Sequence, residues 1–127
     1  MKRESWRDIA GFEGVYQISD FGRVKSLARI IPHLGRWGKI VNQKFKERIL
    51  RPIKNDGYNY VYLSIGGKLH SRKIHRMVAE TFIPNPKNKP TVNHKDGNRS
   101  HNEKSNLEWA TVGENNRHGV ERRKKAS

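Results

Sequence analysis

Apolar and polar side chains alternate over short stretches in the first 75 residues, and this period of two is typical of β-strands. The clearest stretch runs from Tyr58 to Ser64. The turn signal Asn55-Asp56-Gly57 precedes it and Gly66-Gly67 follows it. Residues 49–75 are therefore expected to form an antiparallel meander with Lys and Arg along it.

The N-terminal 48 residues give a weaker strand pattern. Strands are expected at residues 15–18 and 23–27, joined by turn-forming residues 19–22. The apolar residues of this part are expected to form one small cluster: Trp6, Ile9, Phe12, Tyr16 and Val24. Residues 28–48 are basic, contain proline and glycine and have poor periodicity, so a long loop is predicted there.

The hydrophobic period becomes helical at Ile74, and a helix is predicted over Ile74–Phe82. Three prolines then predict a loop at residues 83–91. Short strands are expected at residues 92–95 and 107–111, with a polar loop between them. Residues 113–125 contain no proline and are expected to be a second helix.

Composition and charge narrow the possible functions. The 127 residues, 33% of them hydrophobic, suit one ordinary domain or two very small ones. The net charge of +15 is spread along the chain and favours a long polyanion as partner, with nucleic acid ahead of an anionic membrane. The absence of cysteine excludes disulfide scaffolds, zinc knuckles and thiol nucleophiles. Without a membrane span or a signal-peptide pattern, we expect a cytoplasmic protein with no membrane partner.

Histidine, asparagine and aspartate are concentrated between Thr91 and Gly119. His94 falls on the first expected strand of this window, Asn106 at the entry to the second and Asn115 in the following helix, at intervals of 12 and 9 residues. Imidazole and amide groups brought together on such a strand–loop–strand–helix unit are suited to acid–base and metal chemistry.

Five short motifs follow one another along this part of the chain: His75-Arg76-Met77-Val78-Ala79, Thr81-Phe82-Ile83-Pro84-Asn85-Pro86, Val92-Asn93-His94-Lys95-Asp96-Gly97-Asn98, Asn106-Leu107-Glu108-Trp109, and Glu114-Asn115 with His118. In this order and spacing they resemble the HNH endonucleases, and most of all the phage and intron-encoded homing branch. The resemblance implies a ββα unit that binds one divalent metal ion, Mg²⁺ or Mn²⁺, and hydrolyses phosphodiester bonds of double-stranded DNA.

A second set of motifs lies near the N-terminus: Ile9-Ala10-Gly11-Phe12-Glu13-Gly14, Tyr16-Gln17-Ile18-Ser19 and Gly22-Arg23-Val24-Lys25-Ser26. These resemble a modular motif found in front of homing-type HNH nucleases and presumed to help bind DNA. Together the two resemblances imply an α+β fold. They suggest a β-rich DNA-binding region at residues 1–68 and an HNH ββα-metal nuclease domain with a basic C-terminal helix at residues 69–127.

The resemblance and the chemistry of phosphodiester hydrolysis assign roles within the second region. His94, with an ordinary pKa of about 6.5, is suited to be the general base near neutral pH. The resemblance makes Asn93 and Asn115 metal ligands, with His118 as a further candidate. Asn106 is expected either to satisfy backbone groups of the loop or to orient the His94 ring. Many relatives have Asp where this chain has Asn93, so we expect weak metal binding until a substrate phosphate completes the site.

Affinity for DNA is expected to come from basic residues through counterion release. The principal candidates are Arg23, Lys25, Lys54, Arg72, Lys73 and Arg76. Any sequence readout is expected to use a β-ribbon from residues 20–73 in the major groove. One ββα unit holds one active site, so a monomer is expected to nick; whether the protein is a monomer or a homodimer is left open. A phage-encoded protein in a bacterial host fits the resemblance.

Two other functions fit the same sequence. The chain could be an HNH-like DNA-binding module in which Asn93 has removed catalysis, or an RNA-binding protein that uses the same basic sheet. A plasmid-cleavage assay with and without divalent metal separates the first from an enzyme, and competition between DNA and RNA tests the second.

Overall fold

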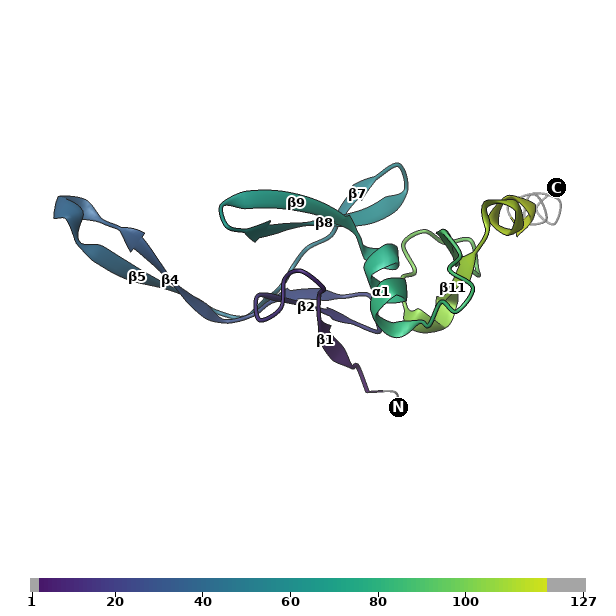
Figure 1. The fold of residues 1–127 in the computed structure, drawn as a ribbon, viewed down its shortest axis with the longest axis horizontal. Helices are drawn as coiled ribbons and strands as arrows, with labels where there is room; N and C mark the ends of the chain where they lie inside the picture. The colour runs from purple at the N-terminus through teal and green to yellow at the C-terminus, as the bar shows by residue number, and fades with distance from the viewer. Residues whose placement is uncertain (1–2, 119–127) are drawn as a thin grey trace.

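The computed structural model describes residues 3–118, and its N-terminal part is an antiparallel sheet (Figure 1). The strands of this sheet, in the order β1-β2-β3-β6, are Trp6–Asp8, Tyr16–Ser19, Val24–Ser26 and Arg48–Ile49. The two strands expected near residues 15–18 and 23–27 are therefore confirmed as β2 and β3. They pair with Ile18 opposite Val24, and both side chains are buried.

A two-stranded hairpin occupies the segment that we predicted to be a loop, and that prediction was wrong. Strand β4 (Arg29–Leu34) pairs with β5 (Ile40–Phe45), and the short turn η1 (Arg36–Gly38) joins them. The hairpin projects away from the rest of the molecule, and apart from half-buried Arg29 all its strand residues are exposed (Figure 1). Alternation signals a strand only where one face is buried. A ribbon with both faces in solvent carries no such signal.

The meander expected at residues 49–75 is present as a three-stranded sheet. Its strands are β7 (Ile53–Asn55), β8 (Tyr58–Ile65) and β9 (Lys68–Lys73). Asp56 and Gly57 at the first turn both have positive φ, 53° and 80°, which is the geometry that favours an Asp-Gly pair. Only Val61 and Leu63 of β8 are fully buried, so one face of this sheet packs on the core.

Helix α1 (Ile74–Phe82) follows directly, as predicted, and a second antiparallel hairpin completes the unit. Strand β10 (Thr91–His94) pairs with β11 (Leu107–Ala110), and η2 (Lys104–Asn106) precedes β11. Residues 112–118 are helical. The remainder of the helix predicted at residues 113–125 lies outside the described residues.

The last helix begins with a capping box. The Glu114 amide donates to Thr111 Oγ1 at 3.1 Å, and the Thr111 amide donates to Glu114 Oε1 at 3.0 Å. The Asn115 amide donates to the Thr111 carbonyl at 3.0 Å. This cap fixes where the helix starts and therefore where Asn115 lies relative to β11.

One hydrophobic core joins the N-terminal sheet, the meander, α1 and the β10–β11 pair. Ile18 from the N-terminal sheet, Leu63 from the meander and Ile74 and Val78 from α1 are almost fully buried within it. The chain thus has the α+β fold that was expected. Residue 68, where we divided the chain, is the first residue of β9, and the division into regions 1–68 and 69–127 stays a prediction.

Trp6 was expected in the apolar cluster with Ile9, Phe12, Tyr16 and Val24, and this was wrong for Trp6 alone. The other four side chains are buried in the core, whereas Trp6 is only half-buried. Its ring instead supports cations: Lys25 Nζ lies 4.4 Å from the ring centroid. None of the helices in the described part of the chain is long and apolar enough to span a bilayer.

The exposure of the β4–β5 hairpin predicts a contrast in stability. Ile40 is 73% exposed, so Ile40→Ala should lower the free energy of unfolding by less than about 0.5 kcal/mol. Leu63 is 0% exposed, so Leu63→Ala should lower it by about 2–5 kcal/mol. Urea denaturation measures both values. A loss above about 1 kcal/mol for Ile40→Ala would show that the hairpin packs on another part of the chain.

Candidate functional site

His94 is the last residue of β10, and its side chain is buried, with 5% of the residue exposed. Its Nε2 lies 2.8 Å from Oδ1 of Asn102, which is also buried. An amide oxygen can only accept, so the neutral ring carries its proton on Nε2 and its lone pair on Nδ1. The arrangement presents His94 as a base of defined tautomer.

Two rings from other elements surround His94. His75 of α1 lies 5.0 Å from His94 between ring centroids, and it stacks on Tyr58 of β8, also at 5.0 Å. The Arg99 guanidinium lies over the Tyr58 ring at 4.6 Å and donates to the Asp56 carbonyl. Three elements and one loop therefore define the space around the base.

The ring cluster favours neutral histidines. Burial, with the nearby His94 as a second cause, lowers the pKa of His75 from 6.5 to about 4. Burial also lowers the pKa of His94, against an opposing contribution from the hydrogen bond to Asn102. His94 is therefore largely unprotonated at neutral pH, as a general base must be.

Asn93, His94 and Asn115 line one small polar cavity of about 70 Å³, together with Tyr58 and Arg99. The Asn93 side chain is fixed by a bond from its Nδ2 to Glu108 Oε1 at 2.9 Å, across the β10–β11 pair. This leaves the Asn93 amide oxygen as the atom that a cation would use. Three residues that are distant in sequence thus share one site.

His118 lines a neighbouring cavity of about 360 Å³. Asn93 lines both cavities, and Glu108, which bonds to Asn93, lines the one with His118. The structure places His118 beside the Asn93 side of the site but not in the cavity of His94 and Asn115. Within the described residues there is no cluster of three or more His, Asp or Glu side chains able to hold a metal. Amide oxygens are therefore the main hard donors at this site.

Asn106 braces the loop after β10. Its Nδ2 donates to Asp96 Oδ1 at 3.0 Å and to the His101 carbonyl at 2.8 Å, and its Oδ1 accepts from the Asp96 amide. Of the two roles expected for Asn106, these bonds match the bracing of loop backbone. The group that bonds to the His94 ring is Asn102.

An ion pair completes the same loop. His101 Nδ1 lies 2.7 Å from Asp96 Oδ2. The hydrogen bond to His101 is the main reason that the pKa of Asp96 falls to about 2, and the same bond raises the pKa of His101. Asp96 is therefore paired mainly with His101, and its negative charge also opposes the lowering of the His94 pKa.

The residues expected to contact DNA fall into two groups. Arg23, Lys25 and Arg76 form ion pairs with Glu4, Glu47 and Glu80 respectively, so part of their charge is neutralised within the chain. The other three lie on the meander: Lys54 on β7, and Arg72 and Lys73 on β9. Their contact with DNA stays a prediction.

Three site residues were missed by sequence reasoning: Asn102, Glu108 and Arg99. Asn102 and Arg99 sit in a polar loop with many equivalent side chains, so their contacts follow only from the loop conformation. Glu108 offered a signal, because pairing of the two predicted strands sets it opposite Asn93. The register of the two strands can be predicted only when the length of the loop that joins them is known.

Comparisons with known proteins identify relatives of this chain. Residues 4–66 match the family model described as the NUMOD4 motif. The chain is 36% identical over 106 residues to DNA endonuclease I-HmuI of Bacillus phage SP01, covering 84% of this chain and 52% of that protein. It is 37% identical over 125 residues to an uncharacterized HNH endonuclease of Acanthamoeba polyphaga mimivirus, covering 94% of this chain and 27% of that protein.

The structural comparison points the same way. A solved structure described as DNA binding and cleavage by the HNH homing endonuclease I-HmuI matches with a TM-score of 0.68 at 35% identity, covering 93% of this chain and 59% of that one. The chain therefore resembles the HNH homing endonucleases over most of its length. It spans about half the length of I-HmuI and about a quarter of the mimivirus protein. The HNH resemblance predicted from sequence is confirmed, and the predicted N-terminal modular motif is confirmed as the NUMOD4 motif.

The buried His75 makes the stability of this chain depend on pH. Its pKa is lowered to about 4 in the folded state, so between pH 6.5 and 4 the unfolded chain binds a proton that the folded one does not. Stability from this group is therefore full above about pH 6.5 and is lost as the pH falls toward 4. The loss by pH 4.5 should be about 2 kcal/mol.

His75→Phe keeps a ring against Tyr58 and removes this titration. Unfolding free energies measured at pH 7.5 and 4.5 should fall by about 2 kcal/mol less in the variant than in the wild type. Parallel pH curves for the two proteins would contradict the assignment.

Proposed function

We propose that this chain is a metal-dependent endonuclease that hydrolyses phosphodiester bonds of double-stranded DNA. The observation that carries the proposal is the single cavity lined by Asn93, His94 and Asn115. One wall offers a buried imidazole held mainly neutral, and the others offer amide oxygens. The endonuclease names of I-HmuI and the mimivirus relative support the same activity.

A divalent cation fits this donor set. Asn93 and Asn115 would hold it through their amide oxygens, which are hard ligands of the kind that Mg²⁺ and Mn²⁺ prefer. His118, beside Asn93, is a further candidate ligand. When bound, the ion supplies positive charge against the negative charge that develops on the phosphate and the leaving oxygen. The Glu108 carboxylate adds negative charge beside otherwise neutral ligands.

His94 is the proposed general base. Its Nδ1 lone pair takes a proton from a water molecule as the water oxygen bonds to phosphorus. The bond between phosphorus and the 3′ oxygen breaks, and the leaving oxygen takes a proton from solvent. Arg99, at the wall of the cavity and held over Tyr58, is placed to contact the charged phosphate.

The β4–β5 hairpin is the proposed principal DNA ribbon. There is no acidic residue between Asp20 and Glu47 in the sequence. The hairpin and its tip carry Arg29, Arg36, Lys39 and Lys44, and Trp37 at the tip is 93% exposed. Isolated two-stranded hairpins are marginal in water, so a ribbon whose strand residues beyond Arg29 are all exposed is suited to a partner surface. A two-stranded ribbon fits the major groove.

Cleavage of supercoiled plasmid tests the proposal. With Mg²⁺ or Mn²⁺ the protein should convert it to the nicked form, and EDTA should stop the reaction. His94→Ala should lower the rate by about 100-fold or more while DNA affinity stays unchanged, because only proton removal is lost. His70→Ala, on β9 with its ring against Phe12, is the matched control for loss of a histidine outside the cavity.

The alternatives predict other results. Tight binding to duplex DNA without cleavage in either metal would favour the catalytically impaired module. Stronger competition by RNA than by duplex DNA would favour the RNA-binding protein. The nicked form as the main product would match one active site per monomer, whereas direct linearisation would indicate a homodimer on DNA.

Charge on the hairpin should control the salt dependence of binding. Replacing Arg36, Lys39 and Lys44 together by Gln should weaken duplex binding and flatten the slope of log K against log salt by as much as about 3, at about 0.9 for each lost phosphate contact. Fluorescence anisotropy at salt concentrations from about 50 to about 300 mM measures this slope.

The control exchanges the same positions while keeping their charge: Arg36→Lys, Lys39→Arg and Lys44→Arg. This variant should retain the wild-type slope, because counterion release depends on charge. Equal slopes for the wild type and the Gln variant would rule out the hairpin as a DNA ribbon.

A further inference from the structure

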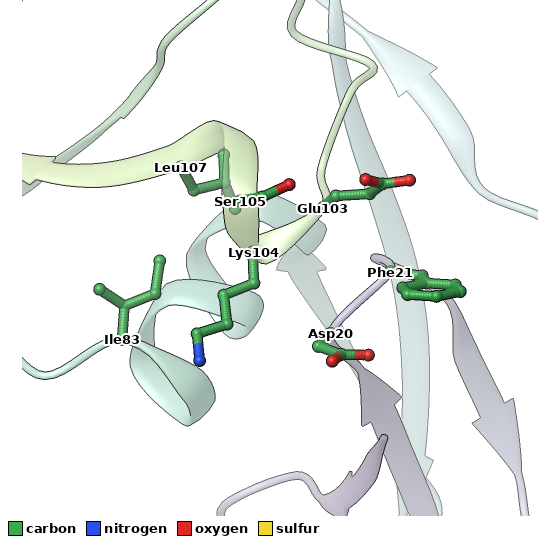
Figure 2. A pocket seen from close by; sticks show the side chains of 7 residues that line it. All are labelled: Asp20, Phe21, Ile83, Glu103, Lys104, Ser105 and Leu107. Carbon is green, nitrogen blue, oxygen red and sulfur yellow. The ribbon is translucent and has the colours of Figure 1, made fainter. Parts of the chain in front are cut away.

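The turn between β2 and β3 packs directly against the loop that carries Asn102. The Lys104 amide donates to the Asp20 carbonyl at 2.8 Å. A Cβ built on Gly22 would lie 2.8 Å from the Asn102 carbonyl oxygen and 2.9 Å from the Asn102 Cβ, closer than real Cβ contacts. Figure 2 shows Asp20 and Phe21 of the turn and Glu103 and Lys104 of the loop around one pocket. Residue 22 therefore touches the loop through bare backbone.

The turn itself is rigid. Gly22 has φ +87°, a conformation that side-chain-bearing residues rarely adopt, and its amide donates to the Ser19 carbonyl. Ser19 is fully buried, and its Oγ accepts from the amides of Phe21 and Arg23. With both strands paired in the sheet, the turn has little freedom to move away from the loop.

Asn102, the residue that Gly22 contacts, also bonds to the proposed base. Asn102 Oδ1 accepts from His94 Nε2 at 2.8 Å, and both residues are about 5% exposed. The carbonyl of the preceding residue, His101, is held by Asn106 Nδ2. A displacement of Asn102 would therefore change the hydrogen bond that sets the tautomer of His94.

We propose that Gly22, in the NUMOD4 segment, positions His94 through its backbone contact with Asn102. Gly22 and Asn102 are positioning residues in this scheme. The N-terminal segment then holds the loop of the cleavage site in place, in addition to its proposed contact with DNA. The inference rests on the proposed endonuclease activity for its kinetic readout, while its structural readout is independent of activity.

The test compares Gly22→Ala with Gly11→Ala. Gly11 has the same φ, +87°, so alanine there meets the same backbone strain of about 1–2 kcal/mol, but nothing lies within 4 Å of its Cβ position. Gly22→Ala should lower the cleavage rate constant at saturating DNA at least 10-fold with unchanged DNA affinity. Gly11→Ala should stay within about threefold of the wild type. Equal rates for the two variants would overturn the proposal.

A spectroscopic measurement reads the tautomer without catalysis. Long-range ¹H–¹⁵N spectra of ¹⁵N-histidine-labelled protein at pH 8 should show His94 protonated on Nε2 in the wild type and in Gly11→Ala. Asn102→Leu, which removes the acceptor, and Gly22→Ala should both lose this single tautomer, whereas Asn102→Asp, which keeps an acceptor oxygen, should retain it. An unchanged tautomer in Gly22→Ala would overturn the proposal even if the wild type does not cleave DNA.

A second variant tests the same contact without a clash. Lys104→Pro removes the amide that donates to Asp20, and Lys104→Ala is its control for loss of the side chain. Glu103, before Lys104, has φ −67° and ψ 144°, a conformation that proline accepts in its neighbour. The rate and tautomer of Lys104→Pro should change in the same direction as those of Gly22→Ala, to a smaller degree. If Gly22→Ala does not fold, wild-type behaviour of Lys104→Pro in both readouts would overturn the proposal.

Discussion

Burial of the apolar face of α1 is the interaction on which the rest of the molecule depends. Ile74, Val78 and Ala79 are almost fully buried, and the helix contacts strands of the N-terminal sheet, the meander and the β10–β11 hairpin. A chain with only 33% hydrophobic residues has too little apolar surface for several independent cores. Sharing one helix brings Tyr58, His75 and His94 together from three separate elements.

The charges around the proposed base differ from those on the surface of the molecule. Around His94 the buried groups are neutral: an imidazole pair and amide side chains, with the Arg99 guanidinium as the cation at the cavity wall. Most of the other basic residues that the structure describes are exposed, on the hairpins and the loops. Buried cations would require paired partners. A strongly basic chain therefore keeps its charge where a polyanion can reach it, while the proposed base stays unprotonated.

Integration of the NUMOD4 segment with the ββα unit is closer than a modular description suggests. Its buried residues belong to the common core, and its β2–β3 turn contacts the loop between β10 and β11. In contrast, the strands of the β4–β5 hairpin within the same segment are exposed beyond Arg29, which bonds to the Val15 carbonyl at the base of the hairpin (Figure 1). The segment thus contains one part that supports the fold and another that extends from it.

Much of this protein was determined by sequence alone. Period-two alternation with Asp-Gly and Gly-Gly turns gave the meander, the change to helical period at Ile74 gave α1, and the ordered motifs from His75 to His118 gave the family. These signals are local, because strand period, turn chemistry and helical spacing depend on neighbouring residues. The two strands of the β4–β5 hairpin were missed because neither face of the hairpin is buried.

Tertiary structure alone decided the contacts within the site. That Asn102 rather than Asn106 bonds to His94, that Glu108 fixes Asn93, and that Gly22 presses against Asn102 all depend on how a loop of interchangeable polar residues folds. Several asparagines lie within reach of one histidine in sequence, and each could form the same bond. The conformation of the loop, which the bonds of Asn106 and the contact with the N-terminal turn hold, decides which of them does.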